Sequence, residues 1–141
     1  MTKQPSEVGT TRGVEEREPR SMSAPLLRFD LSDEAARLRD EREYAEGDRN
    51  ARTLAKVDWF RLTLVALRSG ATLREADQRG SVALQVLQGR VVVRIGEAAV
   101  EIGSAEVAVV APGHPWEAVA EADSLILVHL AWPPEPGPVT T

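Results

Sequence analysis

The chain has 141 residues, no cysteine and a formal net charge of −5 at pH 7. Its length suits one domain that buries its own core. The lack of cysteine excludes disulfides, thiolate metal sites and cysteine nucleophiles, and the acidic balance argues against nucleic acid, whose phosphates bind basic surfaces. No apolar run approaches the roughly 20 residues of a bilayer-spanning helix, and the first residues lack the apolar segment of a signal peptide. We therefore expect a cytoplasmic protein with no nucleic-acid or membrane partner.

The expected domain layout follows from shifts in composition along the chain. Residues 1–24 are polar, charged and interrupted by proline and glycine, which predicts a disordered leader. Residues 25–56 are expected to hold a short strand, a helix and a connector, and residues 57–132 a β-barrel. Residues 133–141 are rich in proline, which cannot donate to a sheet ladder, so this tail is expected to be extended.

One helix is predicted over residues 33–46. Ser32 stands where an N-cap belongs, and Gly47 is a natural C-terminal stop. The apolar stripe of this segment is thin, so we expect the helix on the barrel surface and not in a core. An apolar run over residues 25–29 could form an edge strand, and residues 48–52 have the composition of a polar connector.

After the connector the pattern changes to short apolar runs separated by glycine or proline. The predicted strands cover residues 57–68, 81–87, 90–95, 97–102, 107–111, 116–120 and 124–132. Closely spaced strands with this punctuation are typical of an all-β sandwich or barrel.

Two stretches carry a family resemblance. The first, GATLREADQRGSVALQVLQG over residues 70–89, begins and ends with a glycine. Between the two glycines we expect a turn, a polar crossover and a strand. The second, EVAVVAPGHPWEAVA over residues 106–120, contains a tight turn at Gly113. Their spacing resembles the two sequence motifs of the cupin family over about residues 59–132. The resemblance implies an all-β jelly-roll barrel, a double-stranded β-helix, with a pocket inside.

The residues that would hold a metal in these motifs are replaced in this chain. The three ligand positions of the first motif fall on Ala76, Gln78 and Val82, and the ligand histidine of the second has become Trp116. Alanine also replaces the glycine, proline and asparagine of the second motif, at Ala105, Ala111 and Ala120. Alanine, valine and tryptophan offer no lone pair to a divalent ion, and a lone amide is a weak ligand. We therefore expect the barrel without a metal and without any other cofactor.

One face of the strand over residues 81–87 is predicted to line the barrel interior, because side chains alternate and the ligand-equivalent Val82 sets its face inward. Both histidines are considered as further pocket groups, although a turn histidine such as His114 is usually just solvated. The candidate pocket residues are Ala76, Gln78, Val82, Leu84, Val86, His114, Trp116 and His129. This composition is typical of a small-molecule pocket, and also of a barrel that is filled by its own side chains.

Three functional hypotheses follow. The leading one is a metal-free cupin that binds or senses a small molecule in the barrel cavity, and the family resemblance adds a homodimer. The second is a cupin-type enzyme, a dioxygenase or an isomerase, with an unusual site or with a metal relocated to His114, His129, Glu75 or Glu117. The third is a structural or interaction role with a filled core. No catalytic residue is assigned, because no Ser-His-acid spacing and no phosphate-binding glycine loop stand out.

Overall fold

The structure is a computed structural model that describes residues 22–74 and 79–133. Two short helices, α2 (Leu31–Asp40) and α3 (Arg42–Glu46), precede nine strands in this part of the chain. The strands are β1 (Arg49–Val57), β2 (Phe60–Leu67), β3 (Thr72–Arg74), β4 (Ser81–Gln88), β5 (Arg90–Ile95), β6 (Ala98–Gly103), β7 (Val107–Val110), β8 (Glu117–Ala120) and β9 (Ser124–Ala131). The described helices are all too short to span a membrane. Most of the predicted leader and tail lies outside the described residues.

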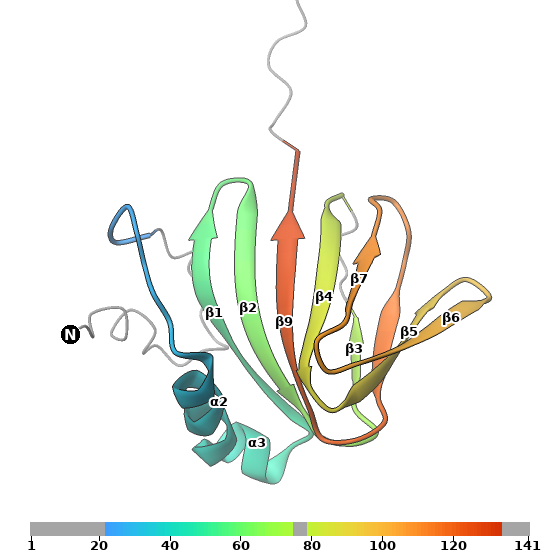
Figure 1. The fold of residues 1–141 in the computed structure, drawn as a ribbon, viewed down its shortest axis with the longest axis horizontal. Coiled ribbons are helices and arrows are strands. Elements are labelled where there is room, and N and C mark those ends of the chain that lie inside the picture. The colour runs from blue at the N-terminus through green and yellow to red at the C-terminus, as the bar shows by residue number, and fades with distance from the viewer. Residues whose placement is uncertain (1–21, 75–78, 134–141) are drawn as a thin grey trace, which may run out of the picture.

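The strands form two antiparallel sheets that curve around one core (Figure 1). Sheet A has five strands in the order β1-β2-β9-β4-β7, and sheet B has four in the order β3-β8-β5-β6. The last strand, β9, therefore lies in the middle of sheet A, between strands from the first half of the domain. This arrangement confirms the predicted all-β jelly-roll barrel.

Apolar residues form two clusters, one on each face of sheet A. The larger cluster fills the space between the two sheets and includes Leu84 and Val91, both fully buried. The smaller cluster lies between the outer face of sheet A and the helices, where Leu38 and Leu64 are fully buried. Sheet A is thus covered on both faces along part of its width, so apolar residues are needed on both sides of its strands.

The start of the helical segment differs from the prediction. Residues 25–29 form no strand. The N-cap is Asp30 and not Ser32, because the Asp30 carboxylate accepts hydrogen bonds from the backbone N–H groups of Ser32 and Asp33 at 3.0 and 3.1 Å. One continuous helix was expected, but the backbone is extended at Glu41, with ψ 154°, and this residue separates α2 from α3.

The barrel begins at residue 49 and not at residue 57. The predicted connector over residues 48–52 is mostly part of β1, which a turn at Asp58 and Trp59 joins to β2. The polar residues of this strand give it the composition of a solvated connector. Asn50 is in fact buried under the helices, where its side chain forms a hydrogen bond. The short strand β3, in a region predicted as a turn, pairs with β8.

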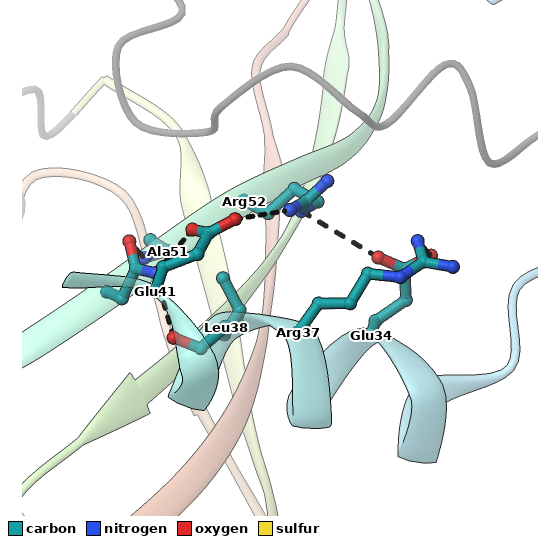
Figure 2. Close-up of polar contacts among 7 residues, drawn as sticks. Glu34, Arg37, Leu38, Glu41, Ala51 and Arg52 are labelled. Atoms are coloured by element: carbon teal, nitrogen blue, oxygen red, sulfur yellow. Dashed lines mark hydrogen bonds and ion pairs between the residues drawn. The ribbon is translucent and has the colours of Figure 1, made fainter. Parts of the chain in front are cut away.

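A buried polar network fixes the helices to β1 (Figure 2). The Arg52 side chain is 4% exposed, and its Nη2 and Nε lie 3.2 Å from Oε2 of Glu41 and 3.7 Å from Oε1 of Glu34. Beside it, Nδ2 of Asn50 donates to the backbone oxygen of Leu38 at 3.0 Å and to Oε1 of Glu41 at 2.8 Å. Because both members of the Arg52–Glu34 pair are buried, each one compensates a charge that water cannot reach.

Replacing Arg52 with methionine should therefore lower the free energy of unfolding by about 3–5 kcal/mol, since the acidic partners lose a buried counter-charge. Urea unfolding measures this change. Arg42→Met is the matched control, because the Arg42–Glu46 pair is 72% exposed on both sides, and its loss should cost less than about 1 kcal/mol. Similar losses in the two variants would show that the buried network does not hold the helices.

Candidate functional site

The register of sheet A arranges its inward-facing residues in rows across the barrel. We call the end of the barrel at the β1–β2 turn the mouth; β9 also ends there and β4 begins there (Figure 1). The row nearest the mouth contains Lys56, Arg61, Leu130, Val82 and Val110. The next row contains Thr53, Thr63, Val128, Leu84 and Ala108. Each row therefore changes from polar on β1 and β2 to apolar on β9, β4 and β7.

Exposure changes along these rows in the same direction. Beside β4 the interior is closed, since Val82, Leu84 and Leu130 are at most 2% exposed. Beside β1 and β2 the inward residues are only half-buried: Thr53, Lys56, Arg61 and Thr63. The inward residues of the two rows thus keep part of their surface exposed only on β1, β2 and β9, and on β7 at Ala108.

Trp132 continues β9 into the mouth. Its backbone N–H donates to the oxygen of Trp59 at 3.0 Å, which ties the end of β9 to the β1–β2 turn. A Cβ atom at Gly80 would lie 3.3 Å from Cδ1 of the Trp132 ring, so the glycine leaves room for this ring. Nζ of Lys56 and Cζ of Arg61 lie 5.5 and 5.4 Å from the ring centroid, within the range of cation–π contacts. We call Thr53, Lys56, Arg61, Thr63 and Trp132 the mouth cluster.

The predicted pocket residues on β4 are core residues. Val82, Leu84 and Val86 lie on the inward face of β4, are at most 2% exposed and pack in the large cluster. Trp116, 8% exposed, belongs to the same cluster. These four side chains are brought together, and they fill the part of the barrel beside β4.

The two predicted histidines are not brought to this group. His114 is exposed in the turn after β7. His129 lies on the outer face of sheet A, where its Nε2 is 3.2 Å from Oε1 of Gln85. Ala76 and Gln78 lie outside the described residues.

The donor set at the described motif positions does not fit a metal. Val82 and Trp116 offer no lone pair to an ion, and in the described part of the chain no three His, Asp or Glu side chains come together as a possible metal site. Of the residues considered for a relocated site, Glu75 lies outside the described residues. Glu117 faces away from the barrel interior. Its two carboxylate oxygens lie 2.9 Å from Nη2 of Arg74 and 3.5 Å from Nη1 of Arg94.

Sequence reasoning missed all five members of the mouth cluster, Thr53, Lys56, Arg61, Thr63 and Trp132. A signal for Arg61 and Thr63 exists in β2, where apolar and polar residues alternate over residues 60–64. In a strand with such alternation, the polar residues usually face the solvent and the apolar residues face the core. Here it is inverted, because the apolar positions of β2 pack under the helices.

Comparison with solved structures identifies the fold. A conserved protein of unknown function from Streptococcus pyogenes matches with a TM-score of 0.64 at 18% identity, over 83% of this chain and 96% of that one. A cupin superfamily protein from Desulfitobacterium hafniense matches with 0.62 at 16% identity, over 82% and 99% of the two chains. An RmlC-like cupin from Shewanella frigidimarina matches with 0.56 at 17% identity, over 63% and 80%. The chain has the cupin fold.

The cupin fold confirms the resemblance that the two motifs carry. Comparisons of the sequence with protein-family models and with curated proteins find no match. Because identities in this range establish a fold and no function, any function of this chain has to be argued from its own residues. The homodimer that the resemblance implies stays a prediction.

The motif glycines have a physical role in this barrel. Gly89 has φ +90°, and a Cβ atom there would overlap the Ser124 side chain, so only glycine fits. Ala105 stands at a position where the family motif has glycine, and its φ is still 70°. Its N–H donates to the oxygen of Val86 at 2.9 Å. The backbone of the motif is therefore kept even where the glycine is lost.

The degree to which Trp116 fills the core can be measured. Replacing this buried ring with alanine should lower the free energy of unfolding by about 3–5 kcal/mol, through lost burial and a residual cavity. The side chain of Trp59 is a matched control because this residue is 57% exposed, and Trp59→Ala should change stability by about 0.5 kcal/mol or less. Equal stability of Trp116→Ala and the wild type would show that the ring does not support the core.

His129 has an uncharged environment on the outer face of sheet A. Its cross-strand neighbours are Leu62 on β2 and Ala83 on β4, and its ring nitrogen meets the neutral amide of Gln85. Partial burial lowers the pKa of His129 below its usual value. The folded state therefore favours the neutral imidazole.

This lowered pKa predicts a pH dependence of stability. The folded state binds fewer protons at His129 than the unfolded state, so the contribution of this residue is complete above the unfolded pKa of about 6.5 and is lost as the pH falls through the folded pKa. The free energy of unfolding should thus fall less for His129→Gln than for the wild type between about pH 7.5 and about pH 5. Urea unfolding at constant ionic strength measures both. An unchanged dependence in His129→Gln would contradict the prediction.

Proposed function

We propose that this cupin is a non-catalytic, metal-free protein that binds or senses a small molecule at the barrel mouth, beside β1 and β2. The observation that supports the proposal is the inverted polarity of this hairpin. Thr53, Lys56, Arg61 and Thr63 face the barrel interior and keep part of their surface exposed. A few convergent polar groups beside an apolar wall are the usual composition of a small-molecule site.

The proposed ligand lies nearer to β2 than to β4. In the second row Leu84 is fully buried, whereas Thr63 and Val128 are half-buried. The hydroxyls of Thr53 and Thr63, which are register partners, can each donate and accept a hydrogen bond. Val128 offers apolar contact beside them, so the row presents both kinds of interaction to one molecule.

The alternatives account for less of the structure. A filled core explains Val82, Leu84 and Trp116, but not why polar residues of β1 and β2 face inward while partly exposed. Among the described residues, no observation favours an enzyme, because the polar groups of the mouth are threonines and cations with no arranged nucleophile and base. The mouth cluster can bind a molecule through its own side chains, and the proposal assigns no metal to it.

A fragment screen followed by ¹H–¹⁵N NMR of the labelled full-length chain tests this function. Fragments that bind should shift the amide resonances of Thr53, Thr63 and Val128. Thr63→Leu replaces an inward hydroxyl with a larger apolar group and should abolish these shifts. Thr72→Leu is the matched control, since Thr72 is on the outward face of β3, and it should retain them.

The same fragments test the absence of a metal. Protein that has been treated with a chelator and dialysed should bind them as well as untreated protein. Binding that is lost with the chelator and restored by a divalent ion would contradict the metal-free proposal. Fragments that shift only outward-facing residues, or a screen that shifts no mouth resonance, would contradict the proposed site.

A further inference from the structure

The outer faces of the two sheets differ in charge. Three cross-strand ion pairs cover the outer face of sheet B: Arg74–Glu117 at 2.9 Å, Arg94–Glu117 at 3.5 Å and Arg90–Glu101 at 3.6 Å. A sheet face with this composition is suited to contact with water. The outer face of sheet A has a different composition between the helices and the β7 edge, where its outward residues are uncharged.

Six of these outward residues form what we call the neutral face. They are Leu62, His129, Ala83 and Val109 in one row of the register, and Gln85 and Val107 in the next. The helices pack on β1 and β2, so the neutral face extends from the edge of the helical layer across β9 and β4 to β7 (Figure 1).

The neutral face is open to solvent and can be covered at low cost. Val107 and Val109 are 54% and 70% exposed, and the other four residues are half-buried. Its two polar side chains already meet each other, with Nε2 of His129 3.2 Å from Oε1 of Gln85. Covering the face would therefore remove mainly apolar surface from water and would leave this polar contact in place. A contiguous apolar area of this kind marks an interaction surface.

The charges of the chain favour a second copy as the molecule that covers this face. The formal net charge is −5, so two copies repel each other and associate most readily where neither presents an acidic residue. A neutral apolar face is complementary to itself, as the two-fold interface between identical chains requires. A different partner would ordinarily be selected by charged groups that match its own, and the neutral face offers none.

His129 is the one residue of the neutral face that titrates near neutral pH. The side chains around it are neutral: Leu62 on β2, Ala83 and Gln85 on β4, and Leu127 and Ala131 on its own strand. Partial burial already lowers the pKa of His129. A second copy would remove more water from the imidazole, and a buried charge without a counter-charge is costly. Association therefore requires the neutral imidazole.

From these observations we infer that two copies of this chain associate through their neutral faces, and that protonation of His129 separates them. The two copies of sheet A would pack face to face, as the sheets of a β-sandwich do. The inference goes beyond the proposed function, because the mouth cluster lies on the opposite, inward face of sheet A. Either one can fail without the other.

Sedimentation velocity of the full-length chain tests the association. Between about 5 and about 500 µM at about pH 7.5, the protein should change from monomer to dimer. Val109→Lys places a charge in the face and should weaken the dimer at least about tenfold. Val100→Lys is the matched control, because Val100 is an exposed valine of β6 in the other sheet, and it should dimerise like the wild type.

The pH dependence of the dimer tests the role of His129. Lowering the pH from about 7.5 to about 5.5 should weaken the wild-type dimer about tenfold, because the separated chains bind protons at His129 that the dimer does not. Protonation of carboxylates lowers the net negative charge and by itself would strengthen association, so the acidic residues predict the opposite sign. His129→Gln keeps a neutral hydrogen-bonding side chain and should dimerise equally at both pH values.

A dilution series of the wild type by ¹H–¹⁵N NMR locates the interface without any variant. The amide resonances of Ala83, Val107 and Val109 should shift between about 500 and about 20 µM, as the dimer dissociates. Those of Arg90 and Arg94, on the outer face of sheet B, should stay unchanged.

Three outcomes would overturn the inference. A protein that stays monomeric at every concentration would refute the association. A dimer that Val109→Lys leaves intact, or whose dilution shifts lie outside the neutral face, would assign the interface to another surface. A dimer of His129→Gln that weakens at low pH as the wild type does would refute the role of His129. The fragment screen at the mouth decides the proposed function separately from all three.

Discussion

The register of β9 determines which residues of sheet A face the barrel interior. This strand pairs along its length with β2 on one side and β4 on the other. Its inward residues Ile126 and Leu130 belong to the large cluster, and its outward residues Leu125 and Leu127 belong to the cluster under the helices. A slip of one residue would exchange the faces of the strands that pair with it. Because the two clusters differ in shape and partners, this constraint also fixes the inward direction of the mouth cluster.

The polarity of β2 is a consequence of the helices on the far side of the sheet. Leu64 is fully buried under α2 and α3, and its neighbour Thr63 therefore faces the barrel. The helices stay in place through the buried Arg52 and its acidic partners. The packing of the helices and the polarity of the barrel interior are thus linked. Where an apolar residue of β2 packs under the helices, the polar residue next to it in the sequence faces the barrel interior.

The sequence predicts the second half of the barrel better than the first. From residue 81 onward, glycine or proline marks every turn except the one between β8 and β9, and the strands agree with the prediction to within one or two residues. The start of β1 could not be predicted, because Asn50 and Arg52 are polar residues that are buried by partners distant in the chain. For the same reason the sequence predicted pocket residues on β4, whereas the partly exposed inward polar residues lie on β1 and β2. A period of two residues identifies a strand but does not identify its inward face, which depends on long-range packing.

The left-handed backbone at Ala105 also has a consequence for motion. Alanine in this conformation costs roughly 1–2 kcal/mol, and the residue sits in the turn that carries the chain from β6 of sheet B to β7 of sheet A. β7 is a four-residue edge strand, with Val109 70% exposed. Opening of this corner releases the strain at Ala105, which lowers the free energy that the opening requires. β1 and β7 are opposite edges of sheet A, so this strained corner lies across the sheet from the hairpin that carries the mouth cluster.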